Sequence, residues 1–274
     1  MSEVICDLCM HQCHLKEGQT GFCRARRNVN GINTCDNYGR LTSLAMDPIE
    51  KKPFARFMPG SLILSAGSYG CNLACPFCQN SMISMTDEHT VNYRTFTAEE
   101  LCDIVISHPE SIGLAFTYNE PLISWEFIRD CAKILKPQNK KIVLVTNGCI
   151  NHRVMAELIP YVDAMNIDLK GDAAFYQKEL QGDIQFVKDT ISFVYDKCHL
   201  EVTTLVIPEK NDSIAFMDQE AKWLASLSDK IPLHLSRYFP RYHYTQPMTP
   251  VETLKTLKET AEKHLKYVYI GNVW

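Results

Sequence analysis

Three cysteines, Cys71, Cys75 and Cys78, lie close together directly after the short apolar run Leu62-Ile63-Leu64. Three neighbouring thiolates suit a soft-metal site with one open coordination position, whereas a closed structural zinc site needs four protein ligands. A four-iron cluster held by three cysteines has such an open position on its fourth iron. The stretch therefore predicts an iron–sulfur cluster at the end of a strand. Three buried structural thiols, or three zinc ligands completed from elsewhere in the chain, are the alternatives.

A second set of cysteines lies near the start of the chain. It consists of Cys6, Cys9, Cys13 and Cys23. This segment has few large apolar residues, so we expect a metal rather than a core of its own to hold it together. A closed four-cysteine zinc site and an auxiliary iron–sulfur cluster both fit the spacing, and four free thiols are the alternative. We predict a metal-binding segment with a linker over residues 1–58 and a main domain over residues 59–274.

The overall charge argues against a nucleic-acid partner, because 32 acidic and 28 basic residues give a net charge of -4. The chain contains no apolar stretch long enough to span a bilayer, and its first residues do not resemble a secretory signal. The 12 cysteines are therefore expected to be thiols and metal ligands in a reducing, cytoplasmic compartment. We expect Arg24, Arg26 and Arg27 to form a solvated face, with a phosphate or carboxylate contact as the alternative.

The main domain alternates between short β-rich runs and stretches of helical period. The predicted strands are Ser61–Ala66, Gly113–Thr117, Lys141–Thr146, Ala164–Leu169, Leu200–Ile207, Pro232–Tyr238 and Tyr267–Ile270. This alternation predicts an α/β fold with a parallel sheet. The domain is shorter than the roughly 250 residues of a full eightfold barrel, so we predict a partial (β/α)6 TIM-like barrel. Two capping boxes, Thr97 with Glu100 and Thr249 with Glu252, predict helix starts.

Polar side chains follow several of the predicted strands, at the end where parallel α/β folds gather their functional residues. Thr117-Tyr118-Asn119-Glu120-Pro121 follows the second strand, and Thr146-Asn147-Gly148 follows the third. Asp168 and Lys170 lie at the end of the fourth strand, and His234 lies on the sixth. These residues are expected to lie around one opening at the carboxyl ends of the strands. For His234, a hydrogen-bonded core histidine is the alternative to a ligand contact.

These motifs resemble those of radical S-adenosylmethionine (SAM) enzymes. The stretches Cys71–Cys78, Thr117–Pro121, Val145–Gly148 and Asp168–Lys170 are similar in order and spacing to enzymes of the pyruvate formate-lyase activating type. The N-terminal cysteine run and the closing Tyr269-Ile270-Gly271-Asn272-Val273 resemble more narrowly the radical SAM enzymes of the AmmeMemoRadiSam system. The resemblance covers nearly the whole chain and implies the radical SAM fold and an oxidoreductase or activase.

The resemblance also implies cofactors and contacts. Cys71, Cys75 and Cys78 would hold a [4Fe–4S] cluster whose fourth iron binds the amino and carboxylate groups of SAM. Reductive cleavage of SAM would then give a 5′-deoxyadenosyl radical that abstracts hydrogen from a substrate. The implied SAM contacts are Phe77, Asn119, Glu120, Thr146, Asn147, Asp168, Lys170 and His234.

The implied partners are an electron donor such as flavodoxin or ferredoxin and a small-molecule or protein substrate. A membrane partner is not expected. Two activities fit the resemblance: hydrogen abstraction from an unidentified substrate, as expected for the AmmeMemoRadiSam type, and installation of a glycyl radical on a partner enzyme. A nucleic-acid modifying radical enzyme and a non-catalytic iron–sulfur or zinc scaffold are further alternatives.

Overall fold

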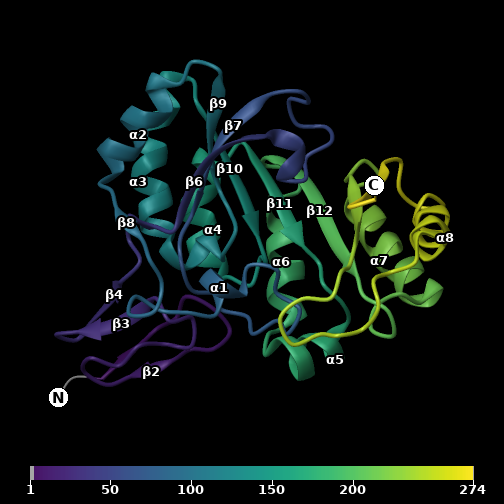
Figure 1. Cartoon of the computed structure of the whole chain (residues 1–274), viewed down its shortest axis with the longest axis horizontal. Helices are drawn as coiled ribbons and strands as arrows, with labels where there is room; N and C mark the ends of the chain where they lie inside the picture. Colours follow the sequence, from purple (N-terminus) through teal and green to yellow (C-terminus); the bar gives the residue numbers. More distant parts are fainter. Residues whose placement is uncertain (1–2, 274) are drawn as a thin grey trace.

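The computed structural model describes residues 3–273 and is organised around one eight-stranded sheet (Figure 1). The strand order is β14-β13-β12-β11-β10-β9-β7-β6. The strands are β6 (Ser43–Pro48), β7 (Leu62–Gly67), β9 (Ser111–Phe116), β10 (Lys141–Thr146), β11 (Ala164–Asp168), β12 (His199–Val206), β13 (Leu233–Arg237) and β14 (Val268–Gly271). All neighbours from β7 to β14 pair in parallel, and β6 pairs antiparallel with β7 at the edge.

The predicted α/β fold with a partial barrel is confirmed. Each of the predicted strands is present, with ends that differ from the prediction by at most about two residues. Strand β6 belongs to the main sheet although it precedes residue 59, the predicted start of the main domain. The division of the chain into two domains stays a prediction.

Helices cover the outer face of the sheet (Figure 1). The longer ones are α2 (Ala98–Ser107), α3 (Trp125–Leu135), α4 (His152–Leu158), α6 (Ile184–Val194), α7 (Ile214–Leu227) and α8 (Val251–Ala261). The short ones are α1 (Ser81–Ser84), α5 (Ala173–Phe175), the 3-10 turns Ile49–Lys51, Pro121–Ser124, Lys136–Gln138 and Ile159–Tyr161, and the π-helix Tyr176–Leu180. No helix within residues 3–273 has the length and apolar character needed to cross a membrane.

The two predicted helix starts have different outcomes. The capping box of Thr97 and Glu100 is confirmed at the start of α2, with both reciprocal hydrogen bonds present. The box of Thr249 and Glu252 is wrong, because α8 is preceded by Pro250 and has no side-chain cap. The Thr249 hydroxyl instead donates to the Val206 carbonyl oxygen at 2.6 Å, since it lies close to the end of β12.

The concave face of the sheet is filled by the segment that follows β6. We call residues 49–57 the strap. Its Ile49 and Phe54 are buried against a small apolar cluster that includes Ile63 and Val143 of the sheet. Glu201 of β12 accepts hydrogen bonds from the backbone N–H groups at positions 55 and 56, at 3.0 and 2.8 Å. These contacts hold the strap across the concave face, at the amino ends of the strands.

The N-terminal segment lies at the opposite edge, beside the carboxyl ends of the strands (Figure 1). Its strands are β1 (Val4–Ile5), β2 (His14–Leu15), β3 (Arg26–Val29), β4 (Ile32–Cys35) and β5 (Arg40–Leu41), the last of which pairs with β8 (Arg94–Thr95).

Arg26 and Arg27 do not form the predicted solvated face and match the alternative of a carboxylate contact. The Arg26 side chain is 2% exposed and donates to the Ile123 carbonyl oxygen and to both carboxylate oxygens of Glu126. Arg27 forms ion pairs with Asp36 and Glu88. The physical reason is that the hairpin β3–β4 packs against the barrel, so these side chains find acidic partners from distant parts of the chain.

Candidate active site

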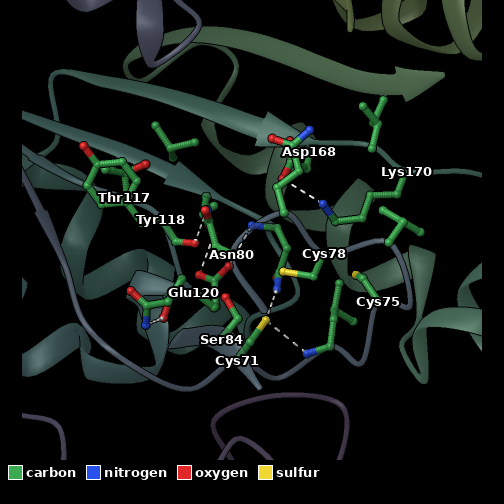
Figure 2. Close-up of a pocket in the computed structure, with 18 of the residues that line it drawn as sticks. Cys71, Cys75, Cys78, Asn80, Ser84, Thr117, Tyr118, Glu120, Asp168 and Lys170 are labelled. Atoms are coloured by element: carbon green, nitrogen blue, oxygen red, sulfur yellow. Dashed lines mark hydrogen bonds and ion pairs between the residues drawn. The ribbon is translucent and has the colours of Figure 1, made fainter. Parts of the chain in front are cut away.

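One cavity of about 420 Å³ lies at the carboxyl ends of the strands (Figure 2). Its lining residues include all of the cysteines of the central set and every implied SAM contact except His234. They are Cys71, Cys75, Phe77, Cys78, Asn119, Glu120, Thr146, Asn147, Asp168 and Lys170. The cavity is within the size range of small-molecule sites in proteins, roughly 300–1,000 Å³. Residues more than 90 positions apart therefore meet around one space because their strands are parallel neighbours.

The three cysteines line this cavity from the loop after β7. Cys71 and Cys75 are buried and Cys78 is half-buried. The Cys71 sulfur accepts from the backbone N–H of Leu73 at 3.4 Å and from the Asn147 amide at 3.6 Å. Burial raises the pKa of Cys71 well above its usual value and that of Cys75 to about 12, so both are protonated until a cation stabilises the thiolates.

The backbone before Cys71 needs a glycine. Gly70 has a φ of +83°, and a Cβ atom there would lie 2.4 Å from the carbonyl oxygen of Cys23. The cavity loop and the N-terminal segment are therefore in direct contact at this point.

Glu120 is the central acidic group of the site and is 2% exposed. Its carboxylate oxygens accept from the Thr146 hydroxyl at 2.6 Å and from the backbone N–H groups of Asn147 and Leu122 at 2.7 and 3.0 Å. Burial nevertheless raises the pKa of Glu120 to about 7, because desolvation outweighs these three donors. Near neutral pH, Glu120 is therefore partly protonated and partly ionised.

A charged pair, Asp168 with Lys170, lines the cavity at the end of β11. The Lys170 ammonium donates to the Asp168 carboxylate at 2.7 Å. Burial opposes the charged form of Lys170, but the Asp168 carboxylate holds the pKa of this lysine above its usual value. Phe77 also lines the cavity, and its ring stacks on Phe175 with centroids 6.0 Å apart.

Asn119 uses its side chain to fix the cysteine loop. Its amide donates to the carbonyl oxygens of Tyr69 and Gly70, both at 3.1 Å. Its side-chain oxygen accepts from the backbone N–H of Ser68 at 2.9 Å. Asn119 therefore positions the loop that carries the first cysteine.

His234 lies apart from the cavity that the other predicted contacts share. Its Nε2 is 2.5 Å from the Glu201 carboxylate, and its ring stacks on Tyr269. Although burial opposes it, hydrogen bonds from His199 and His234 lower the pKa of Glu201 to about 2. This arrangement matches the alternative of a hydrogen-bonded core histidine, since β13 presents residue 234 below its carboxyl end.

The N-terminal cysteines gather next to the cavity loop. Cys6, Cys9 and Cys23 are buried and interact electrostatically, and the Cys13 sulfur accepts from the backbone N–H of Phe22 at 3.5 Å. Within residues 3–273, no group of three or more His, Cys, Asp or Glu side chains is arranged as a ligand set for a single metal ion.

Asn72 connects the two cysteine sets. Its side chain donates to the Cys149 carbonyl oxygen at 2.7 Å, accepts from Asn147 at 2.8 Å and hydrogen-bonds the Cys9 thiol. Its carbonyl oxygen is 3.0 Å from the His11 ring nitrogen. The residue after Cys71 is thus shared by the cavity loop and the N-terminal segment.

The sequence analysis missed part of the cavity. Lys51 and Lys52 also line it, and Asp47 hydrogen-bonds Lys52 and the predicted strand-end residue Tyr118. The signal available in the sequence was a group of charged residues between Pro48 and Pro53, in a stretch that otherwise reads as a linker.

Comparisons with known proteins agree with this geometry. A family model described as the radical SAM superfamily matches residues 66–218. An uncharacterized protein of Methanocaldococcus jannaschii is 39% identical over 276 residues, which covers 99% of this chain and 82% of the relative. A putative glycyl-radical enzyme activating enzyme of the same organism is 25% identical over 221 residues, covering 75% and 87% of the two chains.

Solved structures share the fold. SuiB of Streptococcus suis bound to its precursor peptide SuiA has a TM-score of 0.60 at 13% identity and covers 81% of this chain and 51% of its own. A domain of a pyruvate-formate lyase-activating enzyme from Bacteroides vulgatus has a TM-score of 0.51 at 21% identity, covering 58% and 99%. Since the family model covers more than half of the chain, this protein belongs to the radical SAM superfamily.

Proposed function

We propose that this radical SAM enzyme is of the AmmeMemoRadiSam type, cleaves SAM reductively at the cavity and abstracts hydrogen from an unidentified substrate. The single observation that carries the proposal is the convergence of Cys71, Cys75 and Cys78 with Glu120 and Lys170 on one cavity. A [4Fe–4S] cluster and SAM, when bound, supply a one-electron cleavage that yields a hydrogen-abstracting 5′-deoxyadenosyl radical.

The residues present fit these cofactors. Three soft sulfur donors on one wall suit an iron–sulfur cluster with one iron open to an outside ligand. Lys170 offers a cation for a carboxylate, and Glu120 offers an acceptor for the N–H groups of an amine. Thr146 and Asn147 orient Glu120, and Asn119 holds the cysteine loop. Phe77 lies at the cavity wall where an adenine ring can pack.

We further propose that Cys6, Cys9, Cys13 and Cys23 hold a second metal centre, either zinc or an auxiliary iron–sulfur cluster. The burial of Cys6, Cys9 and Cys23 and the contact of their segment with the cavity loop through Asn72 support this assignment. An auxiliary cluster here would serve as a relay for an electron from a donor such as flavodoxin or ferredoxin.

The test is anaerobic reconstitution followed by metal analysis and an assay for 5′-deoxyadenosine with dithionite and SAM. We expect deoxyadenosine only when both reductant and SAM are present. About four irons with one zinc per chain would assign the N-terminal centre as zinc, and about eight irons would assign it as a cluster. A reconstituted protein that binds SAM but yields no deoxyadenosine with any reductant would show that the proposed reaction is wrong.

The affinity for SAM is expected to rise with pH through neutrality. With a pKa of about 7, Glu120 must lose a proton before its carboxylate fully accepts a hydrogen bond from the amino group of SAM. Between about pH 6 and about pH 7.5, the dissociation constant should therefore fall roughly fivefold or more. Anaerobic calorimetry measures this, with Glu120→Gln as the variant whose affinity should not change with pH. A wild-type affinity that is independent of pH would remove Glu120 from this role.

A second candidate function is that of an activase for a glycyl-radical enzyme. The relative described as a putative activating enzyme, 25% identical to this chain, favours it. The two candidates differ in the size of the substrate. If deoxyadenosine formation is stimulated by the low-molecular-mass fraction of a cell extract, the substrate is a small molecule; stimulation by the protein fraction, with a glycyl radical seen by electron paramagnetic resonance, would favour the activase.

A further inference from the structure

We propose that Lys51 and Lys52 of the strap form an anion-binding subsite for the substrate, which is then an acidic molecule with a carboxylate or phosphate group. The inference rests on the proposed function, because it names the class of substrate for the same cavity. We call Asp47, Lys51, Lys52 and Tyr118 the strap cluster.

The strap cluster lies on one side of the cavity. The Lys52 ammonium donates to the Asp47 carboxylate at 2.8 Å and to the Tyr118 hydroxyl oxygen at 3.2 Å. The Tyr118 hydroxyl donates to the same carboxylate at 2.6 Å. Figure 2 shows Tyr118 on the side of the cavity away from Cys75 and Lys170. The cluster therefore lines a different part of the cavity from Cys75 and Lys170.

A contribution to stability does not by itself explain the strap cluster. Lys52 is 2% exposed, and a buried ion pair commonly adds less stability than apolar residues of the same volume would. Tyr118 also has a φ of +73°, a left-handed conformation that strains the backbone of a non-glycine residue. Gly67 leaves room for its ring, since a Cβ there would lie 2.6 Å from the ring. Strain and buried charge that converge on a cavity wall favour a role in binding.

The cluster carries a net charge of +1, because its two lysines share one carboxylate. Asp47 is the single carboxylate that pairs with both lysines, at 3.4 Å from Lys51 and 2.8 Å from Lys52. Although burial opposes it, hydrogen bonds from Lys52 and Tyr118 lower the pKa of Asp47 to about 2, so it is ionised. Glu50 accepts from the backbone N–H of Gly60 in an exposed position and is not a lining residue.

The other end of the cavity is electrically balanced by comparison, because Lys170 is paired with Asp168. The Lys51 side chain is 67% exposed and only loosely held by Asp47, so its ammonium is free to turn toward a ligand. Two ammonium groups that share one carboxylate suit an anion with several acceptor oxygens, which a carboxylate or a phosphate both provide.

The test is anaerobic titration calorimetry of the reconstituted protein with inorganic phosphate and, separately, with succinate. Titrations with and without SAM show whether Lys170 contributes to the signal. We expect one of the two anions to bind the wild type, and which one binds identifies the acidic group. Lys51→Met should weaken that binding by at least about tenfold, and Lys51→Arg should restore most of it. Because Lys51 is exposed, these variants should fold normally.

Lys255→Met is the matched control, since Lys255 is an exposed lysine on α8 paired with Glu252 and should not affect the binding. The inference is overturned if neither anion binds the wild type, or if Lys51→Met binds as tightly as the wild type. Failure of the proposed function looks different: the wild type then produces no deoxyadenosine, whatever its affinity for anions.

Discussion

Replacing Cys75 with alanine is expected to remove most of the iron that the cavity loop binds and to lower deoxyadenosine formation at least about a thousandfold, because no route to SAM cleavage remains without the cofactor. Cys75 is buried and lines the cavity together with Cys71 and Cys78. Without Cys75, the two remaining thiols give a four-iron cluster too few ligands. Iron analysis, the visible spectrum and the deoxyadenosine assay together measure the effect.

Cys102→Ala is the matched control for this experiment. Cys102 is fully buried between α2 and α3, and its thiol lies 3.5 Å from the Cys131 carbonyl oxygen, so it belongs to neither cysteine set. The variant should keep the iron content and the activity of the wild type. Equal loss in both variants would point to general damage to folding, and full activity in Cys75→Ala would contradict the assignment of the cluster ligands.

Arg26→Met is expected to lower the free energy of unfolding by about 3 kcal/mol, because it removes one partner of a buried ion pair. The Arg26 side chain is 2% exposed, and its loss leaves the Glu126 carboxylate and the Ile123 carbonyl oxygen without their donors. We place the effect at the lower end of the usual range because Glu126 is 26% exposed and water can reach it. Urea denaturation measures the change, and hydrogen exchange shows whether the N-terminal segment separates first.

Two further variants make this prediction specific. Arg153→Met removes an exposed ion pair with Asp7, which also joins the N-terminal segment to the barrel, and should cost no more than about 0.5 kcal/mol. In the double variant of Arg26→Met with Glu126→Leu, much of the lost stability should return, since no unpaired charge remains. A loss in Arg26→Met as small as that of Arg153→Met would contradict the role assigned to the buried pair.

Strands and motifs with a clear pattern in a short stretch of sequence could be predicted without the structure. The strands Lys141–Thr146 and Ala164–Asp168 follow from runs of β-branched and apolar residues bounded by turn and helix signals. The spacing of Cys71, Cys75 and Cys78 predicts a metal-binding site, because a ligand set needs several donor side chains close in the chain. The order of the strands and the polar residues at their ends then indicated one shared site, because the carboxyl ends of parallel strands lie at the same edge of the sheet.

The contacts between side chains far apart in the chain could not be predicted from the sequence and are seen in the tertiary structure. Lys52 reaches the cavity through a strap that reads as a linker, and Arg26 finds Glu126 across 100 positions of the chain. His234 and Glu201 pair on the concave face, although the strand position of His234 alone also suited a ligand contact. These outcomes depend on register, on burial and on which partner satisfies a desolvated charge. Such terms arise from contacts between segments far apart in the chain, so no local pattern in the sequence records them.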